Sequence, residues 1–186
     1  MKNIFTIPNI ISFIRLLMIP FFAIFYFSDN ITNNYILCIV LVVLSGLSDV
    51  IDGFIARKFN MVSDLGKILD PIADKLTQVV ILLCLTINHP SLLPMFGVLF
   101  LKELLTLFAA IYVLSNGAKP ISARWWGKLS TIVIFITMFY TVLLDLIDIS
   151  RIPLYLLTFA SIVCMIISIS GYFKMFSGQV KGDPKK

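Results

Sequence analysis

The chain has 186 residues, of which 59% are hydrophobic and only 13% are charged, and its mean hydropathy is +1.00. Soluble domains are about 25% charged, so this composition excludes an ordinary soluble protein. We expect an all-α polytopic membrane protein in which residues 1–186 form one domain. The net charge of +5 suits an anionic lipid leaflet and gives no reason to expect a nucleic-acid partner.

The first predicted element covers the amino terminus. Isoleucines recur at helical spacing within residues 1–15, with polar residues between them, which predicts an amphipathic helix at the membrane interface. The apolar sequence then runs on through Pro20 to about Phe27 as a first spanning segment. No small-residue cleavage site follows, so we do not expect a cleaved signal peptide.

Five further apolar stretches follow, each with about the 20 residues that a helix needs to cross a bilayer. They are residues 35–56, 68–87, 91–115, 126–147 and 152–174. Because the breaks between them are short, we expect six transmembrane helices with both termini on one side. The sequence turns polar after Phe176, and we expect this tail to be frayed.

The basic residues predict the orientation, because short loops rich in Lys and Arg stay in the cytoplasm. In the six-helix arrangement, thirteen of the fifteen Lys and Arg residues lie on the side of the termini. Arg151 lies on the other side, and Lys102 lies within a span. We therefore expect a multi-pass protein of the plasma membrane with both termini and the loop 57–66 in the cytoplasm.

Acidic residues gather around that loop. Five of the ten acidic residues lie between positions 49 and 74, although carboxylates at a membrane are costly and indicate a functional site. Asp49 and Asp52 are three residues apart, and Asp70 and Asp74 are four apart, so each pair shares a helix face. Two such helices facing each other would bring four carboxylates together.

Four close carboxylates repel one another unless a cation compensates their charge. Ligation by oxygen alone favours Mg²⁺, Mn²⁺ or Ca²⁺ over zinc. Arg57 offers a planar fork for phosphate, and Gly53 and Gly66 let a ligand approach the backbone. Together these residues predict metal-assisted phosphoryl transfer. The plainer interpretation is that the aspartates cap helices and cover a solvated loop.

The complete string reads D-x-x-D-G-x-x-A-R, eight residues, then G-x-x-x-D-x-x-x-D. It resembles the signature of the CDP-alcohol phosphotransferases, integral-membrane enzymes of phospholipid synthesis. Every fixed position is matched, by Asp49, Asp52, Gly53, Ala56, Arg57, Gly66, Asp70 and Asp74. The signature covers about a seventh of the chain, and the length and hydrophobic layout fit the family over the rest.

The resemblance implies a role for each of these residues. It implies that CDP-diacylglycerol binds at Asp52, Gly53, Ala56, Arg57 and Gly66. It implies two Mg²⁺ or Mn²⁺ ions held by Asp49, Asp52, Asp70 and Asp74, with Asp74 also the catalytic general base. Asp64 lies outside the signature, and we expect it to be a loop residue that stabilises the site. The resemblance also implies a homodimer.

The acceptor site is predicted from basic residues outside the signature. Lys102 and Glu103 are adjacent, and one interpretation is that their charges neutralise each other. The other is that Lys102 contacts an anionic substrate. The phosphatidylglycerophosphate synthase branch of the family usually has Arg-Glu near this point, so Lys102 departs from that pattern. The loop 119–128 is either a positive-inside loop or a phosphate pocket, and Gly127-Lys128-x-x-Thr131 resembles a segment of the same branch. The residues predicted to bind the acceptor phosphate are Lys102, Lys119, Arg124 and Lys128.

We therefore expect the phosphatidyl group of CDP-diacylglycerol to pass to sn-glycerol 3-phosphate, giving phosphatidylglycerophosphate and CMP. Phosphatidylglycerol is the first alternative acceptor and would make the chain a cardiolipin synthase; inositol phosphate and serine are others. An intramembrane prenyltransferase also uses Asp-rich motifs, but Gly53-x-x-Ala56-Arg57 has no place in its pattern. A divalent-cation transporter would need carboxylates near the middle of its spans, and here they cluster at one end.

Overall fold

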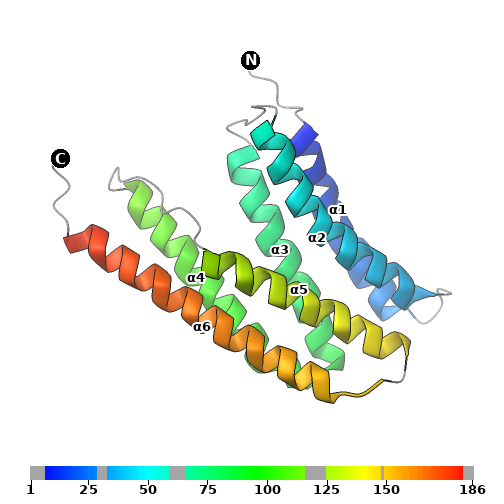
Figure 1. Cartoon of the computed structure of the whole chain (residues 1–186). Helices are drawn as coiled ribbons and strands as arrows, with labels where there is room; N and C mark the ends of the chain where they lie inside the picture. Colours follow the sequence, from blue (N-terminus) through cyan, green and yellow to red (C-terminus); the bar gives the residue numbers. More distant parts are fainter. Residues whose placement is uncertain (1–6, 29–32, 59–65, 116–124, 148, 182–186) are drawn as a thin grey trace. The chain divides into compact units, whose positions relative to one another are not determined.

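The computed structural model describes residues 7–28, 33–58, 66–115, 125–147 and 149–181, with side chains except at 7–9, 49–58, 66–71, 109–115, 125–126 and 172–181. Its elements are α1 (Ile7–Phe27), α2 (Asn34–Lys58), α3 (Gly66–Asn88), the 3₁₀ helix η1 (Pro90–Leu92), α4 (Leu93–Ser115), α5 (Trp125–Leu146) and α6 (Ile152–Lys181). Figure 1 shows them in chain order. Every regular element in the described part of the chain is helical, which confirms the all-α prediction.

The helices form two compact units. The first unit contains Met1–Pro90 and Met138–Arg151, and the second contains Ser91–Thr137 and Ile152–Lys186. The first unit therefore holds α1, α2, α3 and the second half of α5. The second unit holds α4, the first half of α5 and α6.

In the first unit, α1 packs against both α2 and α3. The side chains of Phe22, Tyr26, Cys38 and Leu85 are at most 2% exposed in this core. The rings of Phe22 and Tyr26 stack with their centroids 5.6 Å apart. Because α1 contacts both neighbours, it holds the two helices that carry the acidic signature in one body.

In the second unit, α4 packs against α6, with Leu99 and Met165 fully buried. The hydroxyls of Thr137 on α5 and Ser161 on α6 lie 2.9 Å apart and form a buried hydrogen bond. Hydroxyl pairs of this kind join helices in a bilayer, where water cannot satisfy the polar groups.

The burial pattern is that of a membrane protein, with polar side chains inside and large apolar ones outside. Ser12 and Arg15 on α1 are at most 1% exposed, whereas Phe13 on the same helix is 57% exposed. Apolar side chains are stable in contact with the hydrocarbon of a bilayer, so they need not be buried. Polar side chains are buried instead, because they need hydrogen-bond partners within the protein.

Within its described residues, the structure supports fewer transmembrane helices than the six predicted. Among the described residues, four segments are long and apolar enough to cross a membrane: Ile10–Phe27, Pro90–Phe108, Gly127–Leu146 and Ile152–Gly171. In the part of α2 whose side chains the structure describes, Asn34–Ser48 is an apolar segment of shorter length. The amino-terminal part of α3 carries the charged residues Lys67, Asp70, Asp74 and Lys75.

Two predictions at the chain ends also need correction. The structure shows one continuous helix from Ile7 to Phe27 and no separate interfacial helix in the described residues of this region. The polar residues that suggested a solvated face, Ser12 and Arg15, face the interior. At the other end, α6 continues beyond Phe176 to Lys181, so the tail begins later than predicted.

A polar network joins three elements of the first unit. Tyr26 at the end of α1 donates a hydrogen bond of 2.9 Å to Asp145 Oδ2, and Nε2 of His89, just after α3, lies 2.8 Å from Asp145 Oδ1. A carboxylate near the carboxyl end of a helix such as α5 opposes the helix dipole, so it needs compensation. Tyr26 and His89 supply it and thereby fix the carboxyl end of α3.

Candidate functional site

The acidic signature is divided between two helices of the first unit. The last turns of α2 carry Asp49, Asp52, Gly53, Ala56 and Arg57, and the first turns of α3 carry Gly66, Asp70 and Asp74. The predicted break at 57–66 is shorter than expected, because α2 continues through Lys58. The remaining segment, 59–65, includes Asp64 and lies outside the described residues.

The backbone brings the two halves of the signature to one end of the unit. Only seven residues separate Lys58 from Gly66, and so short a segment limits how far apart the two helix ends lie. Figure 1 shows the end of α2 and the start of α3 at the same end of the unit. The side chains of Asp49, Asp52, Asp70 and Arg57 are outside the described part, so their convergence stays a prediction.

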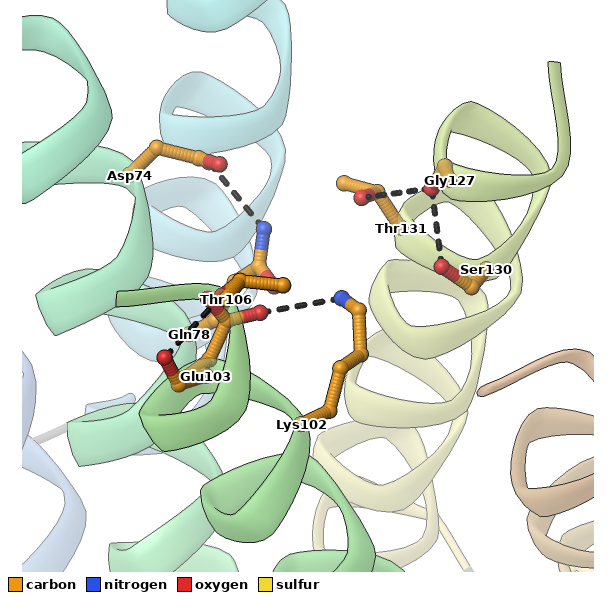
Figure 2. A network of polar contacts seen from close by, with 8 residues as sticks. All are labelled: Asp74, Gln78, Lys102, Glu103, Thr106, Gly127, Ser130 and Thr131. Carbon is orange, nitrogen blue, oxygen red and sulfur yellow. Dashed lines mark hydrogen bonds and ion pairs between the residues drawn. The ribbon is translucent and has the colours of Figure 1, made fainter. Parts of the chain in front are cut away.

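Asp74 is the signature carboxylate whose side chain the structure describes. Its Oδ1 accepts a hydrogen bond of 3.1 Å from Nε2 of Gln78, one turn further along α3 (Figure 2). Gln78 is only 2% exposed, and its neighbour Thr77 donates to the carbonyl of Ala73 at 2.7 Å. Sequence reasoning missed Gln78, although an amide four residues after a signature aspartate was a usable signal.

The donor set fits a hard divalent cation. Four aspartates on two neighbouring helix ends offer only oxygen ligands, which suit Mg²⁺ and Mn²⁺ better than zinc or copper. Among the described side chains, no three His, Cys, Asp or Glu residues are grouped as metal ligands, and three of the four signature aspartates lie outside that set. The chemistry of the donors therefore favours the metal, and its ligand geometry stays a prediction.

The residues predicted for the acceptor belong to the second unit. Lys102 on α4 is 7% exposed, and its Nζ donates to Glu103 Oε1 at 2.9 Å. Thr106 Oγ1 lies 3.4 Å from the other carboxylate oxygen of Glu103 (Figure 2). The pairing of Lys102 with Glu103 is thus confirmed, and a contact of Lys102 with an acceptor stays a prediction.

The start of α5 holds the remaining described part of that predicted pocket. Lys128 is exposed, while the hydroxyls of Ser130 and Thr131 donate to the carbonyl of Gly127 at 2.8 and 3.2 Å. Lys119 and Arg124 fall within 116–124, outside the described residues. The structure therefore describes the side chains of two of the four predicted acceptor residues. Lys102 is buried and paired with Glu103, and Lys128 is exposed.

Known proteins resemble this chain over most of its length. A family model described as CDP-alcohol phosphatidyltransferase matches residues 5–173. An Aquifex aeolicus protein named CDP-diacylglycerol–glycerol-3-phosphate 3-phosphatidyltransferase is 30% identical over 177 residues, which are 91% of this chain and 97% of that protein.

Two relatives carry a different name. A Streptomyces coelicolor cardiolipin synthase (CMP-forming) is 34% identical over 133 residues, which are 69% of this chain and 61% of that protein. A Schizosaccharomyces pombe fusion of cardiolipin synthase with a mitochondrial hydrolase is 35% identical over 112 residues. Those residues are 60% of this chain and only 18% of the fusion protein.

Proposed function

This chain belongs to the CDP-alcohol phosphatidyltransferase family, and we propose that it transfers the phosphatidyl group of CDP-diacylglycerol to sn-glycerol 3-phosphate. The products are phosphatidylglycerophosphate and CMP. Family membership makes the chain a multi-pass membrane transferase of phospholipid biosynthesis. The observation that carries the choice of acceptor is the similarity to the Aquifex aeolicus enzyme, which extends over 97% of that protein.

The proposed nucleotide site lies on the signature of the first unit. There the diphosphate and cytidine of the donor would contact Asp52, Gly53, Ala56, Arg57 and Gly66. The guanidinium of Arg57 suits a phosphate oxygen pair, because its planar fork donates two parallel hydrogen bonds. Two Mg²⁺ or Mn²⁺ ions, when bound by Asp49, Asp52, Asp70 and Asp74, supply positive charge that stabilises the diphosphate and the departing CMP.

The proposed chemistry is one substitution at phosphorus. The acceptor hydroxyl oxygen forms a bond to the phosphorus that carries diacylglycerol. The bond from that phosphorus to the bridging oxygen of the diphosphate breaks, and CMP leaves with the electron pair. Asp74 takes the hydroxyl proton as general base. Since a carboxylate among cations is a weak base, much of its contribution is to position the hydroxyl for attack.

The proposed acceptor pocket contains Lys102, Lys119, Arg124 and Lys128. Lys128 is exposed at the start of α5. Lys102 is already paired with Glu103, so an acceptor phosphate has to compete with that carboxylate for its charge. We therefore assign more of the phosphate binding to Lys128 than to Lys102.

Three further features belong to the same proposal. The basic residues near the signature support an orientation in which that end of the first unit, and both termini, face the cytoplasm at the plasma membrane. A homodimer is proposed from the family alone. Residues 1–186 act as one functional domain, which the family match to residues of both units supports.

A cardiolipin synthase is the second candidate, because relatives at 34% and 35% identity carry that name. Purified protein with CDP-diacylglycerol separates the two when labelled glycerol 3-phosphate, phosphatidylglycerol, inositol phosphate and serine are supplied in parallel. We expect label from glycerol 3-phosphate to enter the lipid fraction as phosphatidylglycerophosphate, with kcat/KM at least about 10-fold above any other acceptor, because a site built for a substrate's polar group discriminates strongly. Cardiolipin formed from phosphatidylglycerol alone would replace the acceptor and keep the reaction class.

A further inference from the structure

Gln78 is a buried amide that the proposed chemistry does not use directly. It lies on α3 with 2% of its surface exposed, four residues after Asp74. Its Nε2 donates a hydrogen bond of 3.1 Å to Asp74 Oδ1 (Figure 2). The family signature ends at Asp74 and includes no residue at this position.

An amide at this place has a free-energy cost that an apolar side chain avoids. A buried primary amide presents two N–H donors and one carbonyl, and each that is left without a partner costs about 1–3 kcal/mol. Much of the rest of α3 toward its carboxyl end is apolar, with Ile81, Leu82 and Leu85 at most 2% exposed. Leucine or methionine would fill position 78 without that cost, but neither could donate the hydrogen bond that Gln78 makes to Asp74.

The direction of the bond follows from helix geometry. Side chains on a helix lean toward its amino terminus, so residue 78 naturally covers the turn that carries residue 74. The donated hydrogen bond fixes one carboxylate oxygen of Asp74 and limits rotation of the carboxyl group. Thr77 shows the contrast, since its hydroxyl bonds to the backbone carbonyl of Ala73 and to no signature side chain among those that the structure describes.

We propose that Gln78 is a positioning residue, whose buried amide holds the Asp74 carboxylate in the orientation needed to bind a divalent cation and to receive the acceptor proton. This inference rests on the role assigned to Asp74 in the proposed function. Residues that orient the ligands of a metal commonly change metal affinity or activity 10–100-fold when they are replaced. Gln78 acts only through Asp74, so its effect disappears when Asp74 is changed.

The test uses full-length protein purified in detergent and compares wild type with Gln78→Met, Asp74→Asn and the double variant. Thr77→Val is the matched control, because it removes a buried side-chain hydrogen bond from the same turn without touching Asp74. The measurements are Mn²⁺ affinity from the electron paramagnetic resonance signal of free Mn²⁺, kcat and KM for CMP release, and Tm. Gln78→Leu replaces Gln78→Met if the methionine variant does not fold.

We expect Gln78→Met to weaken Mn²⁺ binding and to lower kcat by about 10–100-fold each, with the acceptor KM within about threefold of wild type. In protein that already carries Asp74→Asn, adding Gln78→Met should alter Mn²⁺ affinity by less than about threefold. A merely structural role of Gln78 predicts an equal loss in both backgrounds. Thr77→Val should leave both quantities unchanged. An unchanged Mn²⁺ affinity in Gln78→Met, or an equal loss in the Asp74→Asn background, would overturn the inference. If wild-type protein releases no CMP, the proposed reaction fails, and the Mn²⁺ comparison alone still decides the role of Gln78.

Discussion

Asp74→Asn is expected to lower kcat for CMP release by at least about 1,000-fold while the protein stays folded. Asparagine keeps the shape of the side chain and an oxygen that can accept the bond from Gln78. It can neither take a proton from the acceptor hydroxyl nor offer the negative charge that a divalent cation requires. Loss of a general base alone costs 100–10,000-fold as a rough range, and loss of a cation ligand adds to it.

Asp145→Asn is the matched control, because it makes the same chemical change elsewhere in the first unit. It weakens the hydrogen bonds of Asp145 with Tyr26 and His89, so Tm should fall. Each hydrogen bond to a charged group contributes about 1.5–3 kcal/mol to the free energy of unfolding. The kcat of the folded fraction should stay within about threefold of wild type. If Asp74→Asn keeps more than a tenth of wild-type kcat, Asp74 is not the catalytic base.

Removal of divalent cations is expected to abolish activity reversibly. Four carboxylates at two helix ends repel one another without a cation, and charge on the diphosphate then lacks a counterion. Metal-ion stabilisation is worth several kcal/mol, so CMP release should fall at least about 100-fold after dialysis against EDTA. Added Mg²⁺ or Mn²⁺ should restore it.

The control for chelation is EDTA already saturated with Mg²⁺, which should leave the rate unchanged. Tm should be followed in parallel, because binding of a cation to the folded state also raises stability. Full activity in protein whose metal content is below one ion per ten chains would mean that the aspartates serve another purpose.

Hydrophobic composition predicted the helices well. The stretch predicted over 126–147 is α5 at Trp125–Leu146, because a long apolar run in lipid has no alternative to a helix. The two stretches that include the signature are also helical, as α2 and α3. Four described segments are long and apolar enough to span a membrane, and the side chains of most signature turns lie outside the described residues.

The prediction of an interfacial helix at the amino terminus needed correction because a helix face was misinterpreted. Ser12 and Arg15 follow the spacing of a polar helix face, and a polar face was interpreted as a solvated one. In α1 that face is buried, with Arg15 1% exposed. Periodicity identifies a face but cannot tell which side of it meets the protein, the lipid or water.

For the candidate site, residues close in sequence could be predicted and distant contacts could not. The spacing of Asp49, Asp52, Asp70 and Asp74 gave their helical positions, and the pairing of Lys102 with Glu103 was one of two stated possibilities. Tyr26 and Asp145 are 119 positions apart, and nothing in the sequence pattern relates them. Gln78 follows Asp74 at helical spacing, but only its burial and the observed bond distinguish it from an ordinary helix residue.

The most direct measurement follows the phosphorus that the acceptor attacks. Purified protein is supplied with glycerol 3-phosphate, Mg²⁺ and CDP-diacylglycerol labelled with ³²P at the phosphate attached to diacylglycerol. Transfer of the phosphatidyl group predicts that all label stays in the lipid fraction, as phosphatidylglycerophosphate, while unlabelled CMP is released in equal amount. Label in the aqueous fraction, as CDP or free phosphate, would show that a different bond breaks and would contradict the phosphatidyltransferase reaction.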